Sequence, residues 1–444
     1  RNYIYVDANT GEIISKENRI HTADVLGTAH TQYLGIETIT TDSFAGGYRL
    51  REAGRGNGIE TYNMLTGIDY AAAVDFTDAD NDWNNVNAAM DEYATDAHYG
   101  AEMTYDYYML NHNRNSIDDA GMLLYSYVHY DVNYSNAFWD GAEMTYGDGN
   151  NTPFTALDVC GHEITHGVTE HTCNLAGGGE PGAMNEGFSD CIGTAIEYYA
   201  GGATADWTVG EDLGFVIRDM ANPANSGNPD TYQGTNWDFI TQEVHQNSTI
   251  ISHWFYLLSV GGTGTNDNGY TYNVPAHGIA TASDIAYNAW RDYMFSNAQY
   301  IDARQATLNS ATDLFGACSS EVLDVAEGWH AVGVGGAFND TVNVDFSQDI
   351  TTSCTAPATF IFQNLSSNVS VYNWDFGDGT TSTAINPSHT YTSYGTYDVK
   401  LTGSGSCGND SVLYAGLIQI DSTLPCVYMM PLTGSSTLTS CSGL

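Results

Sequence analysis

Hydrophobic and polar positions alternate in different ways along the chain, and the change predicts a β-rich first part and a mainly helical second part. From about residue 28 to 75, aromatic and β-branched residues alternate with polar ones between glycines, as expected for strands. Between 97 and 112 the spacing is helical and directs Tyr105, Tyr108 and Leu110 toward a core. The expected elements are two short strands at 3–15, strands at 28–75 and 120–147, and helices at 97–112, 155–172, 182–200 and between 245 and 330.

The pattern changes again at Gly333–Gly336. Residues 341–421 contain short alternating segments, many Thr, Ser and Asn residues and no helical period, which indicates a small β-sandwich. Residues 422–444 contain one pair of cysteines and few core residues, so we expect a linker or the start of a further domain there. The expected fold class is α+β, followed by an all-β sandwich.

The length and the charge of the chain limit what it can do. At 444 residues it is too long for one ordinary core, so two or three domains are expected. It has no apolar run of about 18 residues, so no membrane span is expected. The chain has 11 basic and 54 acidic residues, and the resulting net charge of −43 repels nucleic acid and anionic membranes. Most carboxylates are expected on a solvated surface, and some are expected to bind calcium.

The eight cysteines include no Cys-x-x-Cys pair, so a cysteine zinc site is not expected. Their even number in a lysine-poor chain indicates an oxidising compartment. Cys354 with Cys407 and Cys426 with Cys441 are the expected disulfides, because each pair lies within one C-terminal segment. The sequence does not indicate how the other four cysteines pair, namely Cys160, Cys173, Cys191 and Cys318.

The run Gly161-His162-Glu163-Ile164-Thr165-His166 carries the clearest chemistry. Its two histidines are four residues apart, so both imidazoles share one helix face and can bind one metal ion. Glu163 lies between them, where a carboxylate can take a proton from an attacking water. Glu186, twenty residues after His166, is the expected third ligand. Three protein ligands and an open position are typical of a catalytic zinc.

Two threonines narrow the class of zinc site. A three-histidine site would need a glycine three residues and a histidine six residues after the second histidine, and this chain has Thr169 and Thr172 there. His171 lies off the metal-binding face of the helix. The glutamate-liganded class is therefore expected. Asp190, four residues after Glu186, is expected to orient a ligand histidine through its free ring N–H.

Longer segments resemble the thermolysin family of neutral zinc metallopeptidases, over roughly residues 24–336. Asn136-Ala137-Phe138-Trp139-Asp140-Gly141 and Tyr146-Gly147-Asp148-Gly149 resemble the edge strand on which this family binds peptide substrates. Asp96-Ala97-His98-Tyr99 and Ala311-Thr312-Asp313-Leu314-Phe315-Gly316 are similar to other family segments. The resemblance implies a two-lobed catalytic domain with a β-rich N-terminal lobe, a mainly α C-terminal lobe and zinc in the cleft.

A second resemblance concerns the C-terminal part. Tyr372-Asn373-Trp374-Asp375-Phe376-Gly377-Asp378-Gly379 and Pro387-Ser388-His389-Thr390-Tyr391 are similar to polycystic-kidney-disease (PKD) repeats, which implies a tryptophan buried between sheets and a tight Gly-Asp-Gly turn. The expected domains are the end of a propeptide-like segment at 1–23, the catalytic lobes at 24–160 and 161–338, a PKD-like sandwich at 341–421 and a linker or truncated domain at 422–444.

The thermolysin resemblance implies roles for residues beyond the zinc motif. His245 matches the histidine that stabilises the tetrahedral intermediate opposite the base, and Arg218 matches the arginine that holds a substrate carbonyl. Asp238 is the candidate to orient His245, at a longer spacing than the usual pattern. The residues expected to contact substrate are Asn136, Ala137, Phe138 and Trp139 along the strand, and Val159, Val209, Leu213 and Ile217 in an apolar pocket.

Two positions depart from the family pattern. Gly177 stands where the family usually has a tyrosine that stabilises the oxyanion, so either another loop supplies one or His245 and the metal act alone. Thr208 replaces an acid in the family's calcium cluster, so one ion is expected there instead of two. The expected calcium ligands are Asp158, Glu197, Asp206 and Glu211 in this cluster, and Asp78, Asp80 and Asp82 in a second loop.

These observations predict a secreted, monomeric bacterial zinc endopeptidase that cuts polypeptides before bulky hydrophobic residues, with Glu163 as the base. The PKD-like module is expected to space domains or to contact insoluble polymers. The alternative is a weakly active or inactive zinc-binding homologue that acts in adhesion or polymer binding. Gly177 favours this alternative, and the intact zinc motif and His245 oppose it.

Overall fold

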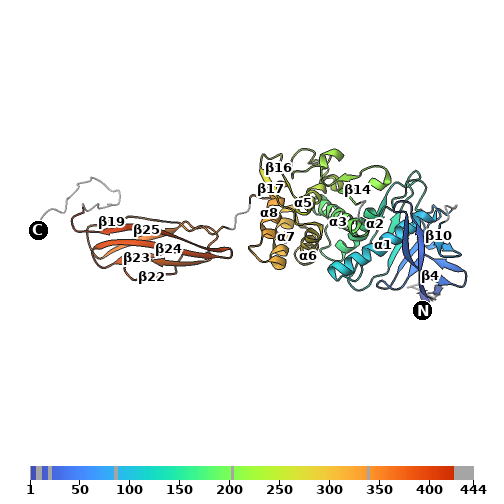
Figure 1. Ribbon diagram of the computed structural model, residues 1–444, viewed down its shortest axis with the longest axis horizontal. Helices are drawn as coiled ribbons and strands as arrows, with labels where there is room; N and C mark the ends of the chain where they lie inside the picture. The colour runs from blue at the N-terminus through green and yellow to red at the C-terminus, as the bar shows by residue number, and fades with distance from the viewer. Residues whose placement is uncertain are drawn as a thin grey trace. The chain divides into compact units, whose positions relative to one another are not determined.

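The structure is a computed structural model, and it forms two compact units (Figure 1). One unit consists of Arg1–Phe315 and Asp324–Ala337, and the other of Gly316–Leu323 and Phe338–Leu444. Within the part of the chain that the structure describes, no helix is both long enough and apolar enough to cross a bilayer. The described residues are 2–6, 13–18, 23–84, 89–201, 205–337 and 341–424.

The two strands predicted at 3–15 are present. β1 (Asn2–Val6) and β2 (Ile13–Asn18) pair antiparallel, with Asn2 opposite Asn18. The turn predicted between them lies outside the described residues.

Two β-sheets follow in the first unit. One has the strand order β10-β3-β4-β5-β9, and the other has the order β12-β13-β11-β7-β6, with β8 paired to β7. β12 pairs with β13 alone and is therefore an edge strand. The bounds are β3 Asp24–His30, β4 Ile36–Phe44, β5 Gly47–Arg49, β6 Arg51–Glu52, β7 Ile59–Asn63, β8 Val74–Asp75, β9 Thr77–Asp78, β10 Asp82–Trp83, β11 Leu124–Val128, β12 Ala137–Trp139 and β13 Met144–Tyr146.

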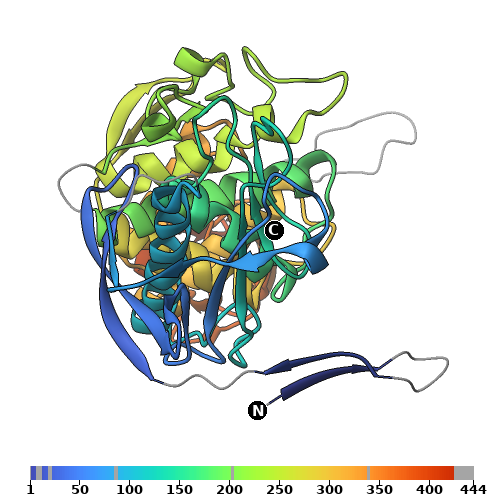
Figure 2. The same ribbon diagram turned by 90° about the vertical axis from the view of Figure 1, so that its right-hand side faces the viewer.

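Helix α1 (Asp91–His112) contacts strands of both sheets (Figure 2). Tyr105 and Tyr108 are buried, as predicted, but Leu110 is 71% exposed. The prediction for Leu110 was wrong because Tyr108 and Leu110 are only two residues apart, about 200° around a helix. A core that receives one of these side chains cannot receive the other.

His98 of α1 connects the helix to both sheets. Its Nδ1 accepts a hydrogen bond from Thr61 Oγ1 of β7 at 2.9 Å, and its Nε2 donates to the carbonyl of Thr40 in β4 at 2.9 Å. The ring is fully buried, and burial lowers its pKa to about 4. The histidine is therefore held neutral between the sheets.

Helices α2 (Leu157–Glu170) and α3 (Gly179–Ala200) are in backbone contact. A Cβ added to Gly193 would lie 2.6 Å from the carbonyl oxygen of Asp158, and one added to Gly161 would lie 3.1 Å from the Cα of Gly193. No side chain fits between the helices there. This contact brings the metal-binding residues of the two helices together.

Helices dominate the rest of the first unit, as predicted for 245–330, although a β-hairpin interrupts them. α5 is largely buried between α3 and α6. The bounds are α4 Val244–Asn247, α5 Thr249–Val260, α6 Ile279–Asp292, α7 Tyr300–Phe315 and α8 Ser320–Ala331, with 3-10 helices η1 Tyr70–Ala72, η2 Glu211–Leu213 and η3 Pro223–Ser226, and with strands β14 Thr208–Val209, β15 Arg218–Asp219, β16 Gly262–Thr265 and β17 Thr271–Val274.

The second unit contains a β-sandwich with the sheet orders β18-β20-β23 and β19-β25-β24-β21-β22. Trp374 is fully buried and packs on Phe346 and Phe362 of the opposite sheet, as predicted. Gly377 and Gly379 have φ of 78° and 90° in the Gly-Asp-Gly turn. The bounds are β18 Phe346–Gln348, β19 Thr352–Ser353, β20 Ala358–Asn364, β21 Val371–Asp375, β22 Thr381–Ser382, β23 Ser388–Tyr391, β24 Gly395–Gly405 and β25 Gly408–Ile420.

The predicted Cys354–Cys407 disulfide is wrong, because Cys407 is bonded to Cys318. Cys407 lies in the turn between β24 and β25, whereas Cys354 follows β19, which pairs with the far end of β25. The 13 residues of β25 separate the two ends by about 40 Å, far beyond disulfide reach. Cys354 is also disulfide-bonded, and Cys160, Cys173 and Cys191 are free and buried. The predicted Cys426–Cys441 pair lies outside the described residues.

The helix contact can be tested with Gly193→Ala. The added methyl would meet the backbone of α2, so we expect a loss of about 1–3 kcal/mol in stability and weaker zinc binding, because α3 also carries Glu186. Thermal unfolding of the apoprotein and a zinc competition titration measure the two effects. The matched control is Gly178→Ala, where an added Cβ meets nothing within 4 Å. Equal behaviour of the two variants would contradict the role of the contact.

His98 makes stability depend on pH. Its folded pKa of about 4 lies below the unfolded value of about 6.5, so its contribution is complete above pH of about 6.5 and is lost as the pH falls toward 4. In His98→Gln, the slope of unfolding free energy against pH in this window should fall by about 1.4 kcal/mol per pH unit. Denaturant unfolding at several pH values measures it. The exposed His171→Gln serves as control, and an unchanged slope in His98→Gln would refute the assignment.

Candidate active site

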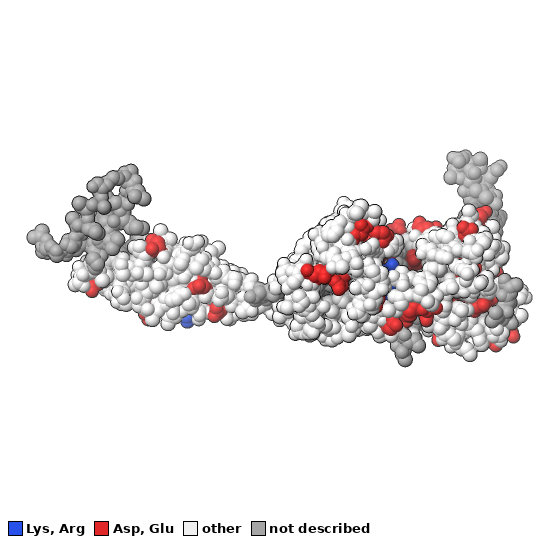
Figure 3. All heavy atoms as spheres, turned by 90° about the horizontal axis from the view of Figure 1, so that it is seen from above, with Lys and Arg blue, Asp and Glu red and all other residues white. Residues whose placement is uncertain are grey.

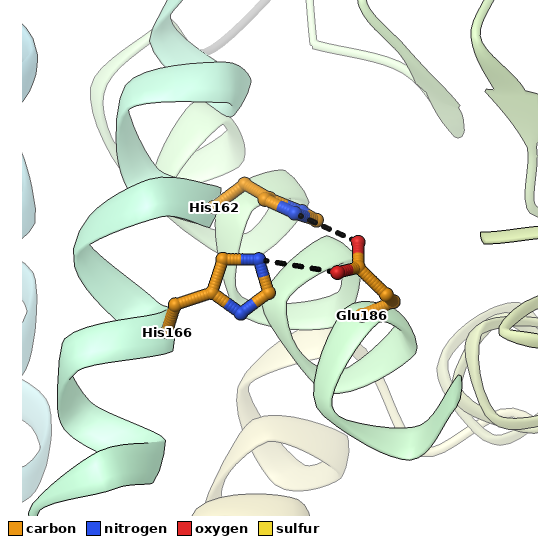
Figure 4. A group of neighbouring side chains, drawn as sticks. All are labelled: His162, His166 and Glu186. Atoms are coloured by element: carbon orange, nitrogen blue, oxygen red, sulfur yellow. Dashed lines mark ion pairs between the residues drawn. The ribbon is translucent and has the colours of Figure 1, made fainter. Parts of the chain in front are cut away.

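His162 and His166 project from α2 toward Glu186 on α3 (Figure 4). His162 Nε2 lies 3.4 Å from Glu186 Oε2, and His166 Nε2 lies 3.6 Å from Glu186 Oε1. Burial alone would raise the pKa of Glu186, but the hydrogen bond with His162 and the charges of both histidines lower it below its usual range. The structure thus brings together the three residues that the sequence predicted as metal ligands.

This group fits a zinc ion. Its ligand atoms all lie within 4.8 Å of one another, and it is the one group of three or more such residues in the described part of the chain that does so. A tetrahedral zinc with bonds of about 2.05 Å has ligand atoms about 3.3 Å apart. The separations of 3.4 and 3.6 Å, which end on the two different oxygens of the Glu186 carboxylate, are close to that distance.

Each ligand histidine has a polar neighbour at its other ring nitrogen. His162 Nδ1 lies 2.9 Å from Oδ1 of Asp190, the residue that the sequence predicted to orient a ligand histidine. His166 Nδ1 lies 3.0 Å from Asn185 Oδ1 and 3.2 Å from Ser189 Oγ, two contacts that the sequence analysis missed. The signal was present, because both residues flank Glu186 on α3 within one helical turn.

Arg218 forms a bidentate ion pair with Asp190 and is buried with it. Its Nε and Nη2 each donate to the carboxylate at 2.6 Å. Burial would raise the pKa of Asp190, but Arg218 and His162 hold it below its usual value. Asp190 therefore stays ionised while it connects a zinc-ligand histidine with an arginine at the cavity wall.

The Glu163 carboxylate is held by the edge strand. Its Oε2 accepts a hydrogen bond of 3.0 Å from the backbone N–H of Trp139 in β12. Trp139 also donates its indole N–H to Glu170 at 2.8 Å. The candidate base therefore lies between the zinc-binding helix and the strand expected to bind substrate.

A cavity of about 530 Å³ contains these groups. Acidic side chains gather in patches on the face seen in Figure 3, where Lys and Arg are rare. Leu213 is buried but does not line the cavity, in contrast to its predicted pocket role. The lining includes the predicted contact residues Asn136, Ala137, Phe138, Trp139, Val159, Val209, Ile217 and Arg218, the zinc and catalytic candidates His162, Glu163, His166, Glu186 and His245, and Phe154, Glu170, Asn174, Leu175 and Asn185.

His245 reaches the same cavity from α4. Its Nε2 lies 3.6 Å from Glu186 Oε2. Asp238 does not orient this ring, and that prediction was wrong: the Asp238 carboxylate accepts hydrogen bonds from Thr241 and from the N–H groups of Ile240 and Glu243. Asp238 is engaged by its own loop, and Glu243 contacts His245 instead.

The acidic residues predicted to bind calcium influence one another electrostatically. Burial raises the pKa of Asp158 to about 6, and burial together with Asp158 raises that of Glu211 to about 7. Burial and the charges of Asp158, Glu211 and Asp206 raise the pKa of Glu197 to about 9. Glu197 Oε2 is buried without a hydrogen-bond partner among the described residues, which suits a cation. No three of these carboxylates meet within 4.8 Å in those residues, so calcium remains a proposal.

The predicted second calcium loop forms a tight acidic turn. Asp78 Oδ1 accepts from the N–H groups of Asp80 and Asn81 at 2.9 and 2.6 Å, and Asp80 Oδ1 accepts from that of Asp82 at 3.2 Å. Asp82 also lies 3.3 Å from His30 Nε2. These bonds explain the turn without an ion, and a calcium site here stays a prediction.

Gly177 leaves open space. A Cβ built on it would meet no atom within 4 Å. Among the described residues that line the cavity no tyrosine is present, so the structure offers no replacement for the family's oxyanion tyrosine there.

Two histidines and a glutamate around one centre, a second glutamate beside them and an edge strand along one cavity define the architecture of a metallopeptidase. Comparison with known proteins gives the family. The catalytic domain of thermolysin metallopeptidases matches residues 26–170, their alpha-helical domain matches 173–334, and a PKD domain matches 339–413. The chain therefore belongs to the thermolysin metallopeptidase family and carries a PKD domain after its catalytic region.

Known relatives agree with this assignment. Bacillolysin of Bacillus cereus is 36% identical over 370 residues, which covers 75% of this chain and 64% of that protein. Thermolysin of Alicyclobacillus acidocaldarius is 37% identical over 360 residues, with the same coverages of 75% and 64%. The transglutaminase-activating metalloprotease of Streptomyces mobaraensis is 36% identical over 367 residues, covering 79% of this chain and 47% of that protein. The chain thus spans between 47% and 64% of these relatives' lengths.

A solved structure shows the same fold. The precursor of protealysin, a metalloproteinase from Serratia proteamaculans, matches with a TM-score of 0.52 and 27% sequence identity. The match covers 62% of this chain and 87% of that one.

Calcium binding by the acidic cluster can be tested by thermal unfolding. Calcium at about 100 times its Kd should stabilise the protein by about 2.7 kcal/mol. Glu197→Gln removes a buried carboxyl group whose ionisation is opposed by burial and by the neighbouring charges, so this variant should be more stable than the wild type without calcium and should gain less from it. An equal gain in both proteins would show that the cluster does not bind the ion. The variant Asp80→Asn measures any contribution of the second acidic loop, Asp78, Asp80 and Asp82, to the stabilisation by calcium.

Proposed function

We propose that this protein is a zinc-dependent endopeptidase that hydrolyses peptide bonds on the N-terminal side of bulky hydrophobic residues. The observation that carries the proposal is the position of Glu163. Glu163 comes directly after His162 in the sequence of α2. Its carboxylate accepts a hydrogen bond of 3.0 Å from the N–H of Trp139 in the edge strand. One group thus touches both the strand that would bind a peptide and the region of the zinc ligands.

The edge strand offers main-chain groups to a substrate. The carbonyl of Asn136 accepts from Gly147 on the β13 side, whereas the N–H of Trp139 points the other way, toward Glu163. Since neighbouring residues of an antiparallel strand direct their main-chain groups to opposite sides, Ala137 directs its N–H and carbonyl outward as Trp139 does. An extended peptide that pairs with Ala137 would lie along the cavity as an added strand.

The side chains around this peptide divide the reaction between them. Glu163 takes the proton of the attacking water and passes it to the leaving amine. His245 donates from Nε2 to the oxygen of the tetrahedral intermediate. Arg218 uses Nε and Nη2 on Asp190, which leaves Nη1 to hold a substrate carbonyl. Zinc, when bound by His162, His166 and Glu186, supplies Lewis acidity to the carbonyl and lowers the pKa of water.

The apolar part of the cavity supports the proposed cleavage preference. Val159 and Val209 are buried, and both line the cavity together with Ile217 and Phe154. A bulky hydrophobic side chain would lose water against these residues at about 25 cal/mol per Å² of apolar surface. The residue that follows the cut bond would occupy this pocket.

We also propose that the protein is secreted by a bacterium. Its Cys318–Cys407 disulfide suits an oxidising compartment, and its net charge of −43 suits a soluble extracellular enzyme. The PKD domain would then space domains or contact an insoluble polymer or other domains.

A second function has one observation in its favour. Gly177 provides no oxyanion-stabilising side chain, and loss of one such donor typically costs about 10²–10³ in rate. A weakly active or inactive zinc-binding homologue, used in adhesion or polymer binding, would fit that loss. The retained positions of Glu163, His245 and the zinc ligands support the enzyme instead.

A peptide library with and without a zinc chelator tests the proposed function. The wild type should cut before bulky hydrophobic residues and lose this activity with the chelator. Glu163→Gln should keep zinc, because Glu163 is not a ligand, and should lose about 10²–10⁴ in kcat. Zinc content by metal analysis is the control. Undiminished cleavage by Glu163→Gln would overturn the mechanism, and a zinc-loaded wild type that cleaves nothing would favour the second function.

A further inference from the structure

His245 faces the zinc ligands without being fixed by packing. Its side chain is 59% exposed, while its Nε2 lies 3.6 Å from Glu186 Oε2. An exposed imidazole has several rotamers available, and only some of them direct Nε2 into the cavity. A hydrogen bond at Nδ1 is therefore what can hold the ring in its useful state.

Glu243 makes this hydrogen bond. Its Oε1 lies 2.8 Å from His245 Nδ1. A carboxylate accepts and does not donate when it is ionised, so the proton of this bond belongs to Nδ1. The opposite nitrogen, Nε2, is thereby directed toward the cavity.

Glu243 is itself held in place by three contacts. Its Oε2 accepts from the N–H of Gln246 at 2.8 Å and caps α4, and its carbonyl accepts from the N–H of Asn247 at 3.0 Å. Its own N–H donates to Asp238 Oδ2 at 2.9 Å. The loop that Asp238 organises therefore ends in a carboxylate of fixed position, one oxygen of which caps the helix while the other holds the histidine.

We propose that Glu243 is the positioning residue for His245, and that it fixes the ring orientation from which His245 stabilises the tetrahedral intermediate. This inference rests on the proposed peptidase function. It assigns to Glu243, two residues before the histidine, the role that sequence analysis gave to Asp238. Asp238 acts one step further away, through the N–H of Glu243.

The chemistry of the pair follows from which ring nitrogen each partner occupies. Glu243 accepts the Nδ1 proton, so an imidazole that is protonated on both nitrogens has its Nε2–H free to donate to a developing oxyanion in the cavity. Since the cavity lacks a tyrosine at Gly177, the rate depends more heavily on this one donor. Glu243 touches neither substrate nor zinc in this scheme and acts through His245.

A double-mutant cycle on the zinc-loaded enzyme tests the proposal. We expect Glu243→Gln to lower kcat about 10-fold with little change in KM, and His245→Ala to lower kcat about 10²–10³-fold. Adding Glu243→Gln to His245→Ala should cost nothing further, because a positioning residue acts only through the group it positions. The control Asp131→Asn removes one exposed carboxylate elsewhere and should leave kcat unchanged.

A second measurement determines directly which ring nitrogen of His245 is protonated. In protein labelled with ¹⁵N-histidine, the His245 signals are those absent from His245→Ala, and the wild type should show a protonated Nδ1. Glu243→Gln should show a mixture of protonated forms, while its unfolding temperature stays near that of the wild type. A role in helix capping alone would leave the tautomer unchanged and would give additive losses in the cycle.

The outcomes separate the two proposals. A wild type that cleaves no peptide overturns the peptidase function and the role of Glu243 with it. An active wild type with an unchanged kcat in Glu243→Gln, with a loss confined to KM, or with additive losses in the His245→Ala background overturns the role of Glu243 alone. Non-additive loss in kcat with a changed tautomer supports it.

Discussion

The site depends on the backbone contact between α2 and α3. Two glycines, Gly161 and Gly193, let the helices approach until an added Cβ would collide with the opposite main chain. His162 and His166 come from one helix and Glu186 from the other, so their separations of 3.4 and 3.6 Å are set by this approach. Helix packing, and not local sequence, thus converts three side chains into one metal-binding group.

Features that depend on helical period were predictable from sequence. Four residues bring His166 onto the face of His162, and four residues bring Asp190 onto the face of Glu186, because an α-helix has 3.6 residues per turn. The structure places Asp190 2.9 Å from His162. The alternation of short segments likewise predicted the sandwich around Trp374. In each case a fixed geometric repeat links sequence distance to spatial distance.

Features that depend on loop geometry or on which strand ends meet were not predictable. No period relates residue 238 to residue 245, and the turn between them directs the Asp238 carboxylate back into its own loop. The pairing of Cys354 with Cys407 failed because closeness in sequence said nothing about the two ends of a long strand. Such contacts follow from the path of the chain, which a single sequence leaves open.

The Cys318–Cys407 disulfide closes a covalent ring that contains the junction between Ala337 and Thr341. A single break of the main chain anywhere inside this ring leaves the two fragments joined through sulfur. Segments that connect domains are common sites of proteolytic nicking. Separation of the sandwich from the rest of the chain would need both a nick within the ring and reduction of the disulfide. A nick alone, which would divide a protein of two domains without such a bond, leaves this chain in one covalently joined molecule.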